Sequence, residues 1–236
     1  MCDERSDFVD AHIVPRSFYP ERGRGREALI VMTMNKNIRN GRSRIEIYDK
    51  YLVCEGCEKK FDPFDDYAAK LLLVNRERHK VIENHGDLVG YLIDTFDYKK
   101  LKLFGLSLLW RSAFTSRIEF SNVKLGPFQG ILTQLLKNED PECPEVFSCQ
   151  LTRFSDVKDW QSGFLSPFRE KYEGINFYRF LLGSYALYVK VDRRPTPKFM
   201  SPFIMRPNAP LILDSREFRG GPEYRAFYRT ANMIRE

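Results

Sequence analysis

Residues 11–15 read AHIVP, and residues 51–58 read YLVCEGCE. Together these two stretches decide the fold that we expect. The first places His12 before an apolar pair and a proline, and a proline disfavours helical backbone in the residue before it. We therefore expect His12 on a loop or at the end of a strand. The second contains a Cys-x-x-Cys pair, Cys54 and Cys57, which we expect to close a strand and open a helix.

The chain between the two stretches predicts a β-hairpin. Residues 28–34 are rich in aliphatic side chains, and residues 42–48 alternate apolar and charged side chains in period two. Asn40 and Gly41 stand between them and form a strong turn signal, because both residues tolerate positive φ. A hairpin is thus expected before the cysteine pair.

A helix is predicted after the cysteine pair. Asp62 is a suitable N-cap, and Pro63 fits the first helical position. Asp65 and Asp66 would then lie in the first turn, where the helix dipole favours negative charge. We expect this helix to run to about Val74.

The remainder of the chain predicts helices followed by a small β-rich layer. The expected fold class is α+β, with an N-terminal module over residues 1–75 and a helical and β-rich region over residues 76–236, packed with the first or separate from it. The expected helices are 98–112 and 127–137, a helix or strand is expected at 88–96, and the expected strands are 146–154, 177–182, 184–192 and 211–213, with Gly183 as a turn.

Composition describes a soluble, basic protein. The 236 residues are 43% hydrophobic and 30% charged, which argues against disorder on the scale of a domain. A formal net charge of +6 suits a polyanionic partner, because Lys and Arg side chains that neutralise phosphates supply most non-specific affinity for nucleic acid. The longest apolar runs are too short and too interrupted to cross a membrane. Residues 1–20 lack the apolar segment of a signal peptide, so we expect a cytoplasmic protein that does not associate with membranes.

The sequence has five cysteines. Because we expect no secretion signal, metal ligation or free thiols are favoured over disulfides. We expect Cys143 and Cys149 to be plain thiols. Arg111 is expected to bury its stem against the core and to pair with a carboxylate. His79 and His85 stand in a polar stretch, and we expect both at the surface.

Residues 11–18 (AHIVPRSF), followed by residues 51–61 (YLVCEGCEKKF), resemble the His-Me finger, or HNH-type, endonucleases. A divergent bacterial branch of that group is similar in having a later Leu-Trp-Arg helix, as at residues 109–111. The likeness covers roughly residues 1–75 and implies a ββα-metal module. In such modules a histidine beside the hairpin is the base for the attacking water, and side chains that include the start of the helix hold a divalent cation.

Residue by residue, the resemblance implies that His12 is the general base. It also implies that Glu58 and Asp62 lie near a catalytic Mg²⁺ or Mn²⁺. The chain departs from the family at Ala11, where an acidic residue is usual, and at Glu58, where Asn or His is often found. These departures bear on activity more than on fold.

The resemblance also implies a structural zinc ion. Such modules commonly use two Cys-x-x-Cys pairs, whereas here only Cys2 stands upstream of Cys54 and Cys57. His12 would complete a tetrahedral Cys₃His site with these three cysteines, which would remove it from catalysis.

Two functions therefore stay open. The first is a metal-dependent endonuclease-like enzyme that hydrolyses phosphodiester bonds in DNA, or as second choice in RNA. The second is a non-catalytic, zinc-stabilised module that binds nucleic acid or protein. An enzyme unrelated to nucleic acid has no support from a P-loop, a Gly-x-Ser-x-Gly or a His-Glu-x-x-His motif.

Overall fold

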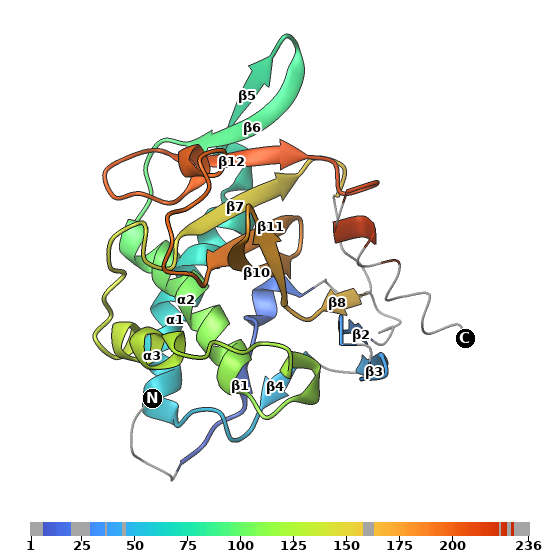
Figure 1. Ribbon diagram of the computed structural model, residues 1–236, viewed down its shortest axis with the longest axis vertical. Helices are drawn as coiled ribbons and strands as arrows, with labels where there is room; N and C mark the ends of the chain where they lie inside the picture. Colours follow the sequence, from blue (N-terminus) through green and yellow to red (C-terminus); the bar gives the residue numbers. More distant parts are fainter. Residues whose placement is uncertain are drawn as a thin grey trace.

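The computed structural model describes residues 7–19, 29–35, 37–43, 46–157, 163–221, 223–225 and 228. Helices and strands are mixed along this part of the chain, so the predicted α+β class is confirmed. Figure 1 shows α1, α2 and α3 gathered at one side of the molecule, beside a large sheet. Among the described residues no helix has both the length and the apolar character needed to cross a membrane.

The large sheet has seven strands in the described part of the chain, in the order β5-β6-β12-β7-β11-β10-β9. Neighbouring strands are antiparallel except β12 and β7, which are parallel. Gly183 has a φ of +59° and turns β10 into β11, as predicted. The strands are β5 (Lys80–Asn84), β6 (Asp87–Ile93), β7 (Cys149–Phe154), β9 (Phe168–Tyr172), β10 (Ile175–Leu182), β11 (Tyr185–Lys190) and β12 (Leu211–Arg216).

Helix α2 (Tyr98–Phe114) is the centre of the core, and it confirms the helix expected at 98–112. The Asp97 side chain caps it by accepting a hydrogen bond of 2.9 Å from the backbone N–H of Lys100. It packs against α1 (Glu55–Ala69), α3 (Phe128–Lys137) and β11. Phe61 of α1 and Trp110 of α2 belong to the same buried cluster, so residues before and after position 76 share one core.

Two small sheets lie in the N-terminal part. β1 (Ala11–His12) pairs with β4 (Tyr48–Asp49) in antiparallel register, with His12 opposite Tyr48. β2 (Leu29–Met32) pairs antiparallel with β3 (Gly41–Ser43) and parallel with β8 (Gly163–Leu165).

The predicted hairpin pairing is confirmed only for β2 and β3, because Tyr48 of the predicted strand 42–48 belongs to β4, and the turn was wrongly placed. Val31 lies opposite Gly41, so Gly41 belongs to the strand. Neither Asn40 nor Gly41 has a positive φ. The Asn40 side chain instead accepts a hydrogen bond of 3.0 Å from the backbone N–H of Thr33 across a longer loop.

The predicted start of the first helix is also wrong. α1 begins at Glu55, directly after Cys54, so Asp62 and Pro63 lie inside it and Asp62 is exposed. An interior proline removes one hydrogen bond of the helix. The early start is nevertheless favoured because it places Cys57, Phe61, Phe64 and Ala68 on one buried face with helical spacing. A π-helical turn at Lys70–Val74 follows, close to the expected end.

Most of the remaining predicted elements are present, and one of the two later histidines lies where we expected it. Residues 88–96 contain the strand β6, and residues 127–137 contain α3. The strands expected near 146–154, 177–182, 184–192 and 211–213 are all present. The surface position predicted for His79 is wrong: the side chain is buried, with Nε2 3.1 Å from the carbonyl of Leu71 and Nδ1 3.3 Å from Nη1 of Arg153. His85 is exposed at the β5–β6 turn, as expected.

Candidate functional site

The segment before His12 runs along the start of α1. The backbone N–H of Val9 donates to the carbonyl of Val53 at 3.2 Å, and the N–H of Glu55 donates to the carbonyl of Asp7 at 3.1 Å. Phe8 forms an antiparallel bridge with Cys54. These contacts bring the strand that carries His12 and the first turn of α1 together, although the two are more than 40 residues apart in sequence.

Arg111 of α2 ties these two elements to each other. Its Nη1 donates to the carbonyl of His12 at 3.1 Å, and its guanidinium donates to both carboxylate oxygens of Asp65 at 2.8 Å. The side chain has no solvent exposure and lies 5.0 Å from the ring of Phe61. The prediction that Arg111 pairs with a carboxylate is confirmed. A permanent positive charge is therefore fixed between β1 and α1.

Within the described chain, Glu58 differs from the other acids of α1 in having a buried, unpaired oxygen and a pKa raised to about 7. It lies in the first turn of α1 and is half-buried, and its Oε2 has no hydrogen-bond partner among the described residues. Burial raises the pKa of Glu58 to about 7, the nearby Arg111 opposes this rise, and Asp65 and Asp62 add to it. Glu58, Asp62 and Asp65 follow the i, i+4, i+7 spacing of one helix face. A carboxylate in this setting favours either a proton or a cation.

His12 is half-buried on β1. Burial lowers its pKa, Glu46 opposes this change, and Arg16 and Arg111 reinforce it. The imidazole is consequently neutral at pH 7, the form in which a histidine accepts a proton or binds a metal ion. Its ring centroid lies 6.4 Å from that of Tyr48, its partner on β4.

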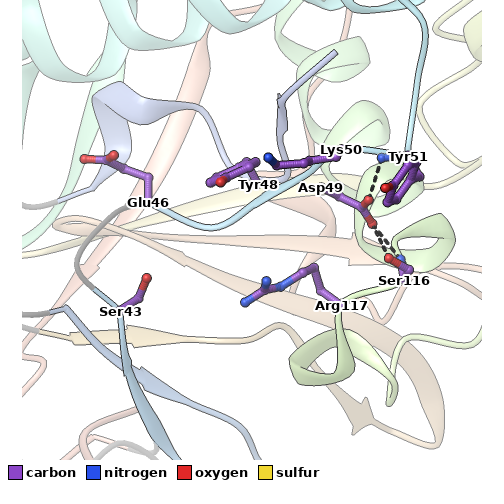
Figure 2. A pocket seen from close by; sticks show the side chains of 8 residues that line it. All are labelled: Ser43, Glu46, Tyr48, Asp49, Lys50, Tyr51, Ser116 and Arg117. Carbon is purple, nitrogen blue, oxygen red and sulfur yellow. Dashed lines mark hydrogen bonds between the residues drawn. The ribbon is translucent and has the colours of Figure 1, made fainter. Parts of the chain in front are cut away.

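A cavity of about 260 Å³ adjoins this strand pair. Figure 2 shows Tyr48 and Lys50 on one side of it, with Arg117 and Ser43 on the other. Tyr48 lines this cavity and is also the register partner of His12, so one residue links the cavity to the strand that carries the imidazole. The other residues that line it are Glu46, Asp49, Tyr51 and Ser116.

Asp49 fixes one wall of this cavity, and the sequence did not single it out. One carboxylate oxygen accepts hydrogen bonds from Thr115 Oγ1 at 2.7 Å and from the N–H and Oγ of Ser116 at 2.7 and 2.9 Å. The other accepts from the backbone N–H of Tyr51 at 2.9 Å. Burial raises the pKa of Asp49, but these hydrogen bonds outweigh it and lower the pKa overall. No local sequence signal connects Asp49 with the residues that follow α2.

In the part of the chain that it describes, the structure does not assemble the predicted metal-ligand sets. Among the described residues no three His, Cys, Asp or Glu side chains gather closely enough to hold a metal ion. Neither the set of His12, Glu58 and Asp62 nor a set of His12 with the two cysteines is therefore assembled as a metal-ligand cluster. Cys54 and Cys57 are both buried at the start of α1. Cys2 lies outside the described residues.

The buried Oε2 of Glu58 lacks a hydrogen-bond partner among the residues that the structure describes, so this oxygen is available to a proton or a cation. Asp62, exposed one turn further along α1, is available to a hydrated cation only from the solvent side. Comparison of the chain with protein-family models, with curated proteins and with solved structures finds no match.

Proposed function

We propose that this protein is a metal-dependent, endonuclease-like hydrolase that acts on phosphodiester bonds in DNA, with RNA as the second choice. One observation carries the proposal. Glu58 is half-buried, its Oε2 has no hydrogen-bond partner in the described part of the chain, and it lies on a helix that Arg111 joins to the strand bearing a neutral His12. The order of β1, β4 and α1 supports a ββα-metal module of the kind that the sequence resembles.

In this proposal each residue has a distinct role. His12 accepts the proton of the attacking water, which its neutral imidazole permits at pH 7. Glu58 would hold Mg²⁺ or Mn²⁺, and Asp62 would contribute a second carboxylate near the ion. The cation, when bound, neutralises charge on the phosphodiester. Arg111 is a positioning residue, because it holds the carbonyl of His12 and the Asp65 side chain rather than the substrate.

The cavity beside β4 provides a place for the substrate backbone. Lys50 is exposed, and Arg117 carries its guanidinium 2.9 Å from Glu119 at the surface. A phosphate would compete with Glu119 for Arg117 and would meet Lys50 across the cavity. The basic balance of the whole chain supports a nucleic-acid partner in the same sense.

The second candidate is a zinc-stabilised module without catalysis, and the cysteines are the residues that favour it. Cys54 and Cys57 are buried beside the segment that leads back toward Cys2. A structural zinc ion on these three cysteines is compatible with either function. The enzyme and the module differ in whether His12 is a zinc ligand, and among the described residues His12 does not gather with Cys54 and Cys57.

The test is cleavage of plasmid and single-stranded DNA by the purified protein with Mg²⁺ or Mn²⁺. His12→Ala is expected to lower the rate by about 10² to 10⁴, the usual contribution of a general base. Glu58→Gln is expected to lower the rate and to abolish the binding of Mn²⁺. Glu55→Gln is the matched control, because Glu55 lies in the same turn of α1 but is exposed and paired with Lys59 at 2.7 Å.

Two results would overturn the proposal. One is a folded wild-type protein that cleaves no nucleic acid with either metal ion. The other is cleavage by His12→Ala at the wild-type rate. Loss of activity in Glu55→Gln as complete as in Glu58→Gln would refute the role assigned to Glu58.

A further inference from the structure

Aromatic side chains stand in two pairs along the antiparallel segments 8–12 and 48–54. The rings of His12 and Tyr48, which are partners in register, have centroids 6.4 Å apart. Toward the start of α1, the rings of Phe8 and Tyr51 meet edge to face with centroids 6.3 Å apart. Each pair takes one ring from either segment, so a row of rings leads from α1 to the candidate catalytic histidine.

The pair nearer α1 is open to solvent. Tyr51 is 75% exposed and Phe8 is 41% exposed. The backbone at Tyr51 is nevertheless fixed, because its N–H donates a hydrogen bond of 2.9 Å to the carboxylate of the buried Asp49. An exposed tyrosine on a fixed backbone offers a flat apolar face to a ligand at a small cost in conformational entropy.

The same segment borders the cavity beside β4. Tyr48 and Tyr51 both line it, and Figure 2 shows Lys50 between them. The Lys50 ammonium lies 5.9 Å from the centre of the Tyr48 ring. A ligand in this cavity would therefore meet aromatic rings and a cation together.

The charges that line this cavity balance. Lys50 and Arg117 are the two cations of the lining, and Glu46 and Asp49 are its two acids. Binding of a polyanion through its phosphates alone depends on an excess of Lys and Arg. Recognition of DNA at this cavity must therefore use the aromatic rings as well as the cations.

This combination distinguishes single-stranded from double-stranded DNA. In a duplex the bases are paired and stacked on one another, so affinity depends mainly on contacts with phosphates. In a single strand the faces of the bases are free, and each can stack on an aromatic side chain. Exposed rings beside balanced charges therefore favour a single strand.

We propose that the DNA bound at this site is single-stranded and stacks its unpaired bases on Tyr51 and Phe8. The inference rests on the proposed function, which supplies DNA as the partner, and it adds the strandedness of the substrate. His12 belongs to the other ring pair of the same two segments, so a strand held at Tyr51 is placed beside the general base.

The experiment measures binding without cleavage. A fluorescently labelled strand of about 12 nucleotides, a length in the range that single-strand-binding folds cover, is titrated with the full chain in EDTA, alone or annealed to its complement. Fluorescence anisotropy gives both affinities at the same salt concentration. The single strand is expected to bind at least about tenfold more tightly than the duplex, as stacking of one or two bases allows.

Variants assign the preference to Tyr51. Tyr51→Ala is expected to weaken binding of the single strand by about 5- to 100-fold, the usual loss when a base loses its aromatic partner, and to leave duplex binding unchanged. Tyr51→Phe keeps the ring and is expected to bind like wild type. Circular dichroism checks that each variant is folded.

Phe199→Ala is the matched control. Phe199 is 55% exposed and meets Tyr172 edge to face, also with centroids 6.3 Å apart, but it does not line this cavity. Its loss is expected to leave the binding of single strand and duplex unchanged.

The proposal is overturned if the wild-type protein does not bind the single strand, or binds it no more tightly than the duplex. It is also overturned if Tyr51→Ala binds the single strand like wild type, or if Phe199→Ala loses as much affinity as Tyr51→Ala. These outcomes are separate from catalysis. A protein that binds the single strand through Tyr51 but cleaves no DNA with Mg²⁺ or Mn²⁺ refutes the proposed function alone, whereas cleavage with equal binding of strand and duplex refutes this inference alone.

Discussion

Arg111 and Asp65 form a two-bond ion pair, with both N···O distances at 2.8 Å, and the arginine side chain has no solvent exposure. The same guanidinium holds the carbonyl of His12 on β1. One side chain on α2 thus fixes the distance between the first helix and the first strand. The candidate site depends on that distance.

Loss of this guanidinium is expected to destabilise the whole protein. Arg111→Ala leaves the Asp65 carboxylate and the His12 carbonyl without their donor, so we expect the free energy of unfolding to fall by about 3 to 5 kcal/mol. Urea denaturation followed by circular dichroism measures the change. Arg117→Ala, at an exposed arginine, is the control and should change stability by less than about 1 kcal/mol. A loss below 1 kcal/mol in Arg111→Ala would contradict the assigned role.

Glu58 is expected to make the stability depend on pH. Its pKa is raised from 4.5 in the unfolded chain to about 7 in the folded protein. Between these values the folded state binds more protons at Glu58 than the unfolded state, so the stabilising contribution of Glu58 is fully present below about pH 4.5 and is lost as the pH rises through about 7. Glu58→Gln removes this component. The measurement is the difference in unfolding free energy between the two proteins from pH 4.5 to 8. A difference that stays constant over this range would show that Glu58 is not perturbed.

Cys54 and Cys57 are expected to hold a zinc ion together with Cys2. Protein purified under reducing conditions should contain about one zinc ion per chain, the number that one Cys-based structural site binds. Cys57→Ser should lose that zinc, whereas Cys143→Ser should retain it because Cys143 is exposed and far away in sequence. Elemental analysis by mass spectrometry gives the stoichiometry. Wild-type protein without zinc, or Cys57→Ser with a full complement, would refute the site.

Glu223 is expected to anchor the segment that follows β12. Its carboxylate is fully buried, lies 2.8 Å from Nη1 of Arg179, accepts a hydrogen bond from Tyr188 and also contacts Arg216. Glu223→Gln removes the countercharge that Arg179 and Arg216 share, while Arg179 keeps its ion pair with Glu170, so we expect a loss of about 1 to 3 kcal/mol in stability. Glu217→Gln is the control, at an exposed acid nearby. Thermal unfolding of the two variants side by side provides the measurement, and equal melting temperatures would contradict the anchor.

The sequence predicted the elements whose signals are local. The helix α2 was predicted from the long apolar run over residues 98–112, and the β10–β11 turn was predicted from Gly183, which has a positive φ. It could not place the start of α1. Asp62 and Pro63 satisfy every local rule for a helix start, yet burial of Cys57 and Phe61 against α2 outweighs those preferences.

The candidate site divides in the same way. By itself the sequence determined the residue types, namely a histidine before Ile-Val-Pro, a Cys-x-x-Cys pair and an acid directly after it. Only the tertiary structure decided that β1 pairs with β4, and not with a strand of the β2–β3 hairpin. It also decided that Arg111 joins His12 to α1. These contacts link residues 36 to 99 positions apart, and their energy comes from burial and charge pairing in the assembled core. No periodicity or turn signal in the chain encodes them.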